Sequence, residues 1–165
     1  MTHETFSFRH PTIDDANQMW DLAKRSSLDT NSSYSYLMMA KFFNDRCYVV
    51  YDRQAEMVVG FVTGFVLKGD VYFVWQICID PNYRGQGLAY SLLTHALKSM
   101  IAKEDVKFVQ ATVDPSNEAS MNLFRRISKT YHTFFATKDG FEEDHFPDDK
   151  PEERLVQVGP LNIEY

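Results

Sequence analysis

The stretch that most constrains the fold is Trp75 to Leu93, where an apolar run, a glycine-containing turn and a helical pattern follow one another. The apolar run Val71 to Ile79 ends at Asp80-Pro81, and because proline cannot donate a ladder hydrogen bond, the strand it predicts stops there. Arg84 to Ala89, RGQGLA, then opens a helix. Its apolar residues recur at three- and four-residue spacing: Leu88, Leu92, Leu93, Ala96, Leu97 and Met100.

A strand, a glycine turn and a helix start together form a geometry that binds phosphate. Glycine lets the backbone approach a ligand closely, and the free N–H groups of the first helical turn point at the anion. The turn is not a Walker A loop, because it has no Gly-Lys-Ser/Thr, nor a dinucleotide fingerprint, because it lacks a third glycine. On Gly85 and Gly87 alone, an ordinary helix start is an equally good interpretation.

Length and composition limit the class of protein. The 165 residues suit a single domain over residues 1–165, and 44% hydrophobic with 24% charged residues is typical of a soluble globular protein. A net charge of −6 argues against a nucleic-acid partner, which needs a basic face, and weakly favours a cationic substrate. No apolar stretch is long enough to span a bilayer, and residues 1–10 lack a signal-peptide core. We therefore expect a cytoplasmic protein with no membrane partner.

The two cysteines, Cys47 and Cys78, lie in apolar strand-like runs, which favours buried thiols over a disulfide or a metal site. Gly60 and Gly64 interrupt one predicted strand and indicate a bulge or a close approach by another group. The acidic stretch from Gly140 to Glu153 predicts an exposed loop.

The remaining pattern alternates strands and helices, which predicts a mixed α/β sheet. The expected further strands are Phe6 to Arg9, Cys47 to Tyr51, Met57 to Leu67, Phe108 to Val113, Tyr131 to Thr137 and, at the sheet edge, Leu155 to Val158. Three further helices are expected. The first follows Thr12 and ends near Lys24 to Ser27, and the second has its helical pattern from Tyr36 onward. The third runs from Glu118 to Arg126, with Asn117 as its cap.

Arg84 to Ala89, after a strand that ends in Asp-Pro, resembles the pyrophosphate-binding motif of the GNAT superfamily of N-acetyltransferases. The resemblance implies the α/β GNAT fold, a mixed and mostly antiparallel twisted sheet flanked by helices. It also implies acetyl-CoA as co-substrate. The implied cofactor-binding residues are Gln76, Ile77, Cys78 and Ile79 for the pantetheine, then Arg84, Gly85, Gln86, Gly87, Leu88 and Ala89 for the pyrophosphate, with Asn117 and Ser120.

Three further stretches narrow the family. Leu28-Asp29-x-Asn31-Ser32-x-Tyr34-x-Tyr36-Leu37, Trp75-Gln76, and Asn117-x-Ala119-Ser120-x-x-Leu123-Phe124-Arg125-Arg126 closely resemble the L-2,4-diaminobutyrate acetyltransferases of ectoine biosynthesis. The match runs from about residue 8 to Pro160. It implies transfer of an acetyl group to the γ-amine of diaminobutyrate, a homodimer, and no metal.

The chemistry suggests roles for individual residues. An ammonium must lose a proton before it attacks a thioester, and a carboxylate or an ordered water can accept that proton. A dibasic substrate also needs a carboxylate to hold its non-reacting end, worth about 1.5–3 kcal/mol per charge-assisted hydrogen bond. Asp29 and Glu153 are the carboxylate candidates, and Trp75 and Tyr34 are candidate walls of the substrate pocket. The further substrate-binding candidates are Asn31, Ser32 and Thr112. For Asp29 a helix cap, and for Trp75 a core position, remain open.

Two departures from the family pattern leave roles open. Phe124 stands where many GNAT enzymes carry a tyrosine that protonates the leaving thiolate, so the general acid is unassigned. Lys150 stands near the place of a family histidine, and His145 lies five residues earlier. Three other functions stay possible at this stage: an acetyltransferase for another small amine, one for a protein or peptide, and a catalytically inactive acyl-CoA-binding regulator.

Overall fold

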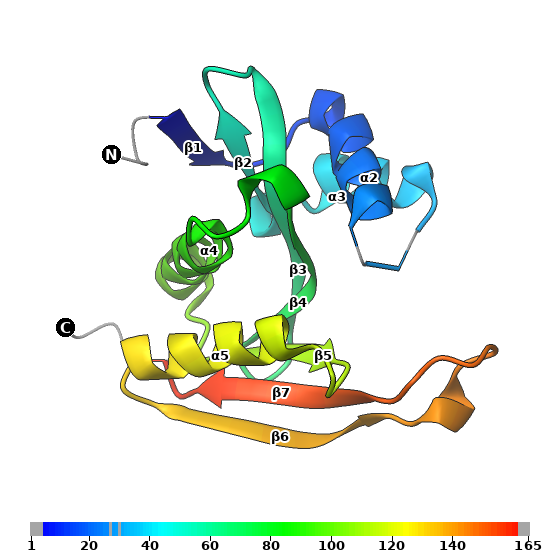
Figure 1. Ribbon diagram of the computed structural model, residues 1–165. Helices are drawn as coiled ribbons and strands as arrows, with labels where there is room; N and C mark the ends of the chain where they lie inside the picture. The colour runs from blue at the N-terminus through cyan, green and yellow to red at the C-terminus, as the bar shows by residue number, and fades with distance from the viewer. Residues whose placement is uncertain (1–4, 27, 30, 162–165) are drawn as a thin grey trace. The chain divides into compact units, whose positions relative to one another are not determined.

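The computed structural model describes residues 5–26, 28–29 and 31–161 (Figure 1). Its strands are β1 (Phe6–Arg9), β2 (Tyr48–Asp52), β3 (Met57–Leu67), β4 (Val71–Ile79), β5 (Phe108–Val113), β6 (Phe134–Phe141) and β7 (Glu153–Gly159). Its helices are α2 (Ala16–Arg25), α3 (Ser33–Phe42), α4 (Leu88–Glu104) and α5 (Glu118–Thr130). Short 3₁₀ turns are η1 (Ile13–Asp15), η2 (Asn44–Arg46), η3 (Pro81–Tyr83) and η4 (Glu143–His145).

The strands form one seven-stranded sheet in the order β1-β2-β3-β4-β5-β7-β6. The pairs β1–β2, β2–β3, β5–β7 and β6–β7 are antiparallel, whereas β4 and β5 pair in parallel. The parallel ladder joins Val71–Phe73 to Phe108–Gln110. The expected mixed, mostly antiparallel sheet with flanking helices is therefore confirmed.

The chain divides into two compact units. Unit 1 runs to Phe65 and resumes over Val74–Lys98, and unit 2 comprises Val66–Phe73 and the chain from Ser99 onward. β3, β4 and α4 therefore each contribute residues to both units. The expectation of a single domain stays a prediction.

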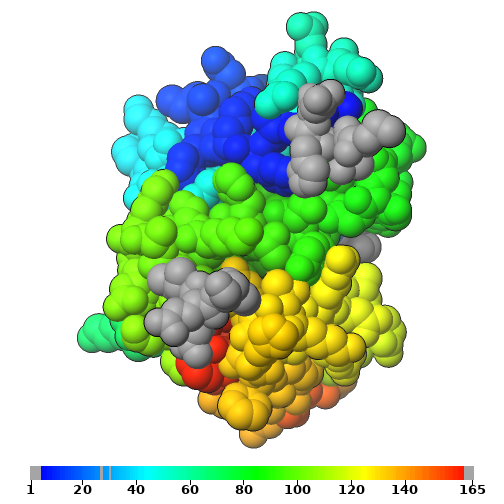
Figure 2. Space-filling model, turned by 90° about the vertical axis from the view of Figure 1, so that its left-hand side faces the viewer, coloured from blue at the N-terminus to red at the C-terminus, as the bar shows by residue number. Residues whose placement is uncertain are grey.

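Unit 1 covers its strands with helices on both faces (Figure 1). On one face α2 and α3 bury a cluster that includes Met19, Tyr36, Val49 and Phe61. Tyr48 is the neighbour of Val49 in β2, so its side chain points to the opposite face. There its ring lies 5.1 Å from that of His95 in α4. The outer side of α4 is on the molecular surface, in green in Figure 2.

The structure confirms α4, the helix that the apolar pattern predicted. All six residues of that pattern are buried, at 4% exposure or less: Leu88, Leu92, Leu93, Ala96, Leu97 and Met100. Burying one leucine side chain contributes about 1.5–3 kcal/mol, so this stripe holds the helix against its strands. The start of the helix, which follows the glycine turn, is fixed by the same packing.

Unit 2 packs α5 against β7 (Figure 1). The buried residues of α5 are Met121, Phe124, Ile127 and Ser128. In β7 the buried valines Val156 and Val158 alternate with the half-buried Leu155 and Gln157. The alternation leaves Leu155 and Gln157 on the opposite face of the sheet from the valines.

The structure corrects the expected C-terminal elements. Leu155 to Val158 was expected at the sheet edge, but β7 lies between β5 and β6 and pairs with both. An alternating pattern reports which face is buried, not whether the backbone has one neighbour or two. β6 starts at Phe134 rather than Tyr131, because α5 continues past Arg126 to Thr130 and Tyr131 serves as its C-cap.

The other boundaries follow the sequence closely. β1, β3, β4 and β5 have the predicted limits, β2 is shifted by one residue, and α3 begins at Ser33, ahead of Tyr36. The end of the first helix falls at Arg25, and Ser27 lies outside the described residues. Within the described part of the chain, no helix has the length and apolar character needed to cross a membrane.

Gly60 shows both predicted features. The β2–β3 register shifts between Val50 and Tyr51, beside Gly60, and a Cβ on Gly60 would stand 2.6 Å from Ile79 Cδ1. Both cysteines are buried free thiols, as predicted.

Candidate active site

The glycine turn before α4 has the conformation that the sequence required. Gly85 and Gly87 have φ values of +81° and +75°, in the left-handed region that glycine adopts without a steric cost. Residues 84–87 are exposed, and Leu88 is buried at the helix start. A Cβ on either glycine would meet no described atom within 4 Å. The turn therefore presents open backbone and the first-turn N–H groups of a long helix, a suitable anion site.

Two carboxylates hold the chain just before the turn. Asp80 is 2% exposed, accepts a hydrogen bond of 2.9 Å from the Asn82 backbone N–H, and pairs with Arg25 at 3.1 Å. The Tyr83 hydroxyl donates a hydrogen bond of 2.6 Å to Asp52 Oδ2. This bond lowers the pKa of Asp52 and raises the pKa of Tyr83 to about 12.

Sequence reasoning missed these supports. The Asp80-Pro81 pair is a recognisable start of a helical turn and could have identified Asp80. Nothing in the sequence links Tyr83 to Asp52, because the two residues are 31 positions apart.

The strand β4 directs its side chains alternately to two faces. Gln76 and Cys78 are buried, whereas Trp75, Ile77 and Ile79 are half-buried. Burial raises the pKa of the Cys78 thiol, and its sulfur lies 3.8 Å from the Leu22 carbonyl oxygen. A buried neutral thiol of this kind is a structural group and not a nucleophile.

Three of the predicted substrate-binding residues precede α3, and a fourth, Tyr34, lies in the first turn of that helix. Asp29, Ser32 and Tyr34 are exposed, and Asn31 is half-buried. Ser32 occupies the N-cap position of α3, so the helix-cap interpretation of Asp29 is wrong. Asp29 is an exposed residue, as a side chain that receives a cationic ligand needs to be.

Trp75 belongs to a cluster of aromatic rings. Its ring centroid lies 6.4 Å from that of Tyr36 and 6.4 Å from that of Phe65. It is only half-buried. Trp75 thus packs against two rings and still keeps part of its surface accessible, which suits a pocket wall better than a core position.

Tyr36 and Gln76 form a buried polar pair that the predicted roles did not include. The Tyr36 hydroxyl donates a hydrogen bond of 2.8 Å to Gln76 Oε1, and the two residues are 0% and 6% exposed. Gln76 was predicted only as part of the strand beside the cofactor. The sequence around Tyr36 gives no sign that its hydroxyl bonds to Gln76, 40 positions away, so only the fold reveals the pair.

Unit 2 places Thr112 and Glu153 on one face of its strands. Thr112 pairs with Leu155, and Glu153 lies two residues before Leu155 in β7. Side chains two positions apart in a strand share a face. That face is opposite the one that carries the buried Val156 and Val158.

The N-terminus of α5 behaves as predicted for a helix cap. Asn117 Oδ1 accepts a hydrogen bond of 3.1 Å from the Ser120 backbone N–H. Phe124 is 1% exposed and lies in the apolar core, where it has no hydroxyl to offer.

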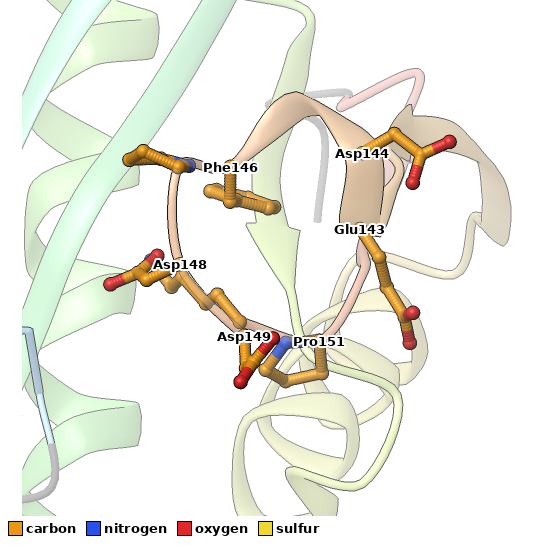
Figure 3. Close-up of a pocket in the computed structure, with 8 residues that line it drawn as sticks. Glu143, Asp144, Phe146, Asp148, Asp149 and Pro151 are labelled. Carbon is orange, nitrogen blue, oxygen red and sulfur yellow. The ribbon is translucent and has the colours of Figure 1, made fainter.

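The acidic loop between β6 and β7 is exposed, as expected, and curls around a hollow of ≈ 680 Å³. Figure 3 shows the Phe146 ring pointing into the hollow while the carboxylates of Glu143 and Asp144 point away from it. None of the described residues forms a group of three or more His, Cys, Asp or Glu side chains that could hold a metal ion. The residues that line the hollow include none from the glycine turn.

The two residues with open roles have different surroundings in this loop. Glu142 donates its backbone N–H to His145 Nδ1 at 2.8 Å, so His145 closes the turn η4. Lys150 Nζ lies 3.9 Å from Glu153 Oε2 and 4.8 Å from the centre of the Phe146 ring. Lys150 is therefore the one of the two that contacts a candidate carboxylate.

The predicted site residues thus form two groups. Unit 1 brings together Asp29, Asn31, Trp75 and Gln76, and also carries the glycine turn. Unit 2 carries Thr112, Glu153, Asn117 and Ser120.

Comparison with known proteins identifies the family. Residues 16–128 match the acetyltransferase (GNAT) family. The chain is 42% identical over 161 residues to the L-2,4-diaminobutyric acid acetyltransferase of Marinococcus halophilus, covering 96% of this chain and 92% of the relative. The chain belongs to the L-2,4-diaminobutyric acid acetyltransferases of the GNAT family. A second member of this acetyltransferase family, from Shouchella clausii, is 43% identical over 154 residues, 92% of this chain and 85% of its own.

Solved structures agree with this family. The diaminobutyrate acetyltransferase EctA from Paenibacillus lautus, in complex with its substrate L-2,4-diaminobutyric acid and coenzyme A, superposes with a TM-score of 0.87 at 30% identity. The superposition covers 97% of this chain and 98% of that one. The ribosomal-protein-S18-alanine N-acetyltransferase from Escherichia coli, at 16% identity and a TM-score of 0.73 over 97% of this chain and 96% of its own, shares the fold.

Proposed function

We propose that this chain transfers the acetyl group of acetyl-CoA to the γ-amine of L-2,4-diaminobutyrate, the acetylation step of ectoine biosynthesis. The observation that carries the proposal is the similarity to diaminobutyrate acetyltransferases along 96% of the chain, at 42% identity. A match of that extent includes the glycine turn and the Asp29 segment together. It distinguishes this function from those of GNAT proteins that share only the fold.

The residues of unit 1 fit acetyl-CoA. The turn of residues 84–87 is exposed, its two glycines have positive φ, and it opens a helix of 17 residues. Such a turn suits the pyrophosphate, and β4 from Gln76 to Ile79 suits the pantetheine. When bound, acetyl-CoA supplies the activated acetyl group. A backbone N–H of β4 is our candidate donor for the negative charge that develops on the carbonyl oxygen.

The carboxylates would act on the amine substrate. We assign Asp29 to hold an ammonium of diaminobutyrate, because the carboxylate is exposed and is not the cap of α3. Glu153, on the face of β7 opposite Val156 and Val158, is our candidate to bind the second polar end or to accept the proton, directly or through water. Trp75 offers its accessible side as a wall that limits rotation of the small substrate.

We also propose that the active form is a homodimer in the cytoplasm. The support is the family resemblance. Size-exclusion chromatography with light scattering tests the assembly, and a mass equal to one chain at assay concentrations would refute the dimer.

The decisive experiment is an acetylation assay. Purified protein is incubated with acetyl-CoA and diaminobutyrate, and free thiol release and the acetylated product are measured. We expect release that depends on both compounds, with product carrying acetyl on the γ-nitrogen. Acetyl-CoA binding without turnover would identify a regulator. Turnover of peptide amines in preference to diaminobutyrate would identify a protein acetyltransferase.

Chain length of the diamine gives a second test. Ornithine and lysine differ from diaminobutyrate by methylenes, and a pocket discriminates roughly 10–200-fold per methylene. We expect slow acetylation of ornithine and very little of lysine. Equal kcat/KM for all three would show that the pocket is open and that a short diamine is not the selected substrate.

A further inference from the structure

The segment that carries Asp29 is attached to β4 by buried side chains. Gln76 Nε2 lies 3.4 Å from the Asp29 carbonyl oxygen, in position to donate a hydrogen bond, and Gln76 Oε1 accepts the Tyr36 hydroxyl at 2.8 Å. One buried amide therefore contacts both the polar segment and α3. The carboxylate of Asp29 remains exposed while its backbone is held.

Asn31 joins the same network from the other side. Its side chain hydrogen-bonds to the Tyr36 hydroxyl and, with Gln76, opposes the rise in the pKa of Tyr36 that burial causes. Tyr36 gives its only hydroxyl proton to Gln76, so its oxygen must accept from the Asn31 amide. The bonds then run from Asn31 to Tyr36 to Gln76, and from Gln76 to the Asp29 carbonyl.

Burial makes this network costly if it is incomplete. Tyr36 is fully buried and Gln76 is 6% exposed, so each polar atom left without a partner carries its whole desolvation penalty. Apolar residues of the same size would fill this position in a core built for packing alone. Because Gln76 Oε1 accepts the hydrogen bond from Tyr36, the Nε2 end of the same amide faces the Asp29 carbonyl oxygen.

We propose that Tyr36 and Gln76 are positioning residues for the amine substrate: they fix the backbone of Asp29 and the side chain of Asn31 and so set selectivity for a short diamine. This inference rests on the proposed function. Neither residue needs to contact substrate. Fixing both ends of a short polar segment defines where its carboxylate can meet an ammonium, and a small error there weakens binding of the correct substrate most.

The test uses Tyr36→Phe and Gln76→Met, which keep the size of each side chain, and the double variant. We expect the KM for diaminobutyrate to rise about tenfold in each variant, the size of effect that one buried hydrogen bond carries. In Tyr36→Phe, whose side chain belongs to α3 and not to the cofactor strand β4, the KM for acetyl-CoA should not change. The preference for diaminobutyrate over ornithine should shrink. The double variant should resemble the single variants, because each breaks the same network.

Ser128→Ala is the matched control for stability. It removes a hydroxyl that donates a hydrogen bond of 2.6 Å to the Arg125 carbonyl oxygen in α5. Ser128 is 8% exposed, so its burial is similar to that of Gln76. We expect it to lower the Tm without changing either KM. An unchanged KM for diaminobutyrate in Tyr36→Phe, whatever its Tm, would overturn the inference. Tyr36→Phe alone decides the matter if Gln76→Met does not fold, since it retains the aromatic ring.

Hydrogen–deuterium exchange separates this inference from the proposed function. We expect faster exchange of the peptide covering Leu28 to Ser32 in Tyr36→Phe than in wild type, without any substrate present. Unchanged exchange would refute the attachment even in an active enzyme. Wild-type protein that does not acetylate diaminobutyrate would refute the proposed function, while faster exchange in the variant would still support the attachment.

Discussion

At the scale of single residues, the charge of Asp29 offers the sharpest test. Asp29→Asn keeps the shape of the side chain and removes its charge. If a bound ammonium desolvates the carboxylate, the loss should be about 2–4 kcal/mol, a fall of about 30- to 1000-fold in kcat/KM for diaminobutyrate. Affinity for acetyl-CoA, measured by calorimetry, should not change.

Asp105→Asn is the control for Asp29→Asn. Asp105 is also an exposed aspartate, it contacts Lys107 at 3.4 Å, and its φ of +52° is one that asparagine tolerates. We expect its kcat/KM to stay near wild type. A similar loss in both variants, or a lower Tm with normal kinetics in Asp29→Asn, would contradict the assignment.

Thr63 presents a different kind of residue effect. Its side chain is fully buried in β3, and its hydroxyl has no hydrogen-bond partner among the described residues. A buried hydroxyl without a partner costs about 1–3 kcal/mol. Thr63→Val replaces it with a methyl group of similar size, so we expect a higher urea midpoint at an unchanged m-value. A lower midpoint would show that the hydroxyl has a stabilising partner.

At the scale of elements, the glycine turn before α4 should depend on Gly87 for ligand binding. Gly87→Ala adds a methyl group on an open backbone at φ +75°, and we expect acetyl-CoA binding to weaken at least tenfold in calorimetry. Gly69→Ala is the control, because Gly69 has φ +85° and equally open surroundings. Both variants should lose similar stability, roughly 1 kcal/mol, from the same backbone strain. Equal acetyl-CoA affinity in the two would remove the pyrophosphate from this turn.

The hydrogen bond from Tyr83 to Asp52 ties the chain before this turn to β2, and it makes a pH prediction. The pKa of Asp52 is lowered by the bond, so its stabilisation is present above the unfolded value near 4 and is lost as pH falls through the folded value. The pKa of Tyr83 is raised to about 12, so its stabilisation is present below about 10 and is lost as pH rises towards 12.

Tyr83→Phe should therefore be less stable than wild type across the neutral range. Urea unfolding of both proteins over pH gives the comparison. We expect the difference in unfolding free energy to be constant from about pH 5 to pH 9 and to shrink at both extremes. A difference that does not change with pH would mean that Tyr83 stabilises only through packing of its ring.

At the scale of the whole molecule, the net charge of −6 should attract a cationic substrate by long-range electrostatics. The screening length falls from about 10 Å at 0.1 M salt to about 3 Å at 1 M. We expect the KM for diaminobutyrate to rise a few-fold between those concentrations, with circular dichroism unchanged. A KM independent of salt would confine the attraction to contacts at the site.

Sequence reasoning located the elements whose local pattern is strong. The limits of β3, β4 and β5 and the buried stripe of α4 follow from hydrophobic periodicity, which acts over neighbouring residues. The positive φ of Gly85 and Gly87 also follows locally, because few other residues adopt that conformation. The family, with its co-substrate, followed from the same turn and from the Asp29 segment.

Only the tertiary structure decided what depends on residues far apart in the chain. The place of β7 inside the sheet depends on two partner strands, and the Tyr83–Asp52 bond joins residues that no local pattern connects. The same holds for Tyr36 and Gln76, 40 positions apart, whose polar groups can be buried only because each satisfies the other. The sequence determines which residues favour burial or a turn. The folded chain determines which polar groups form hydrogen bonds once water is excluded.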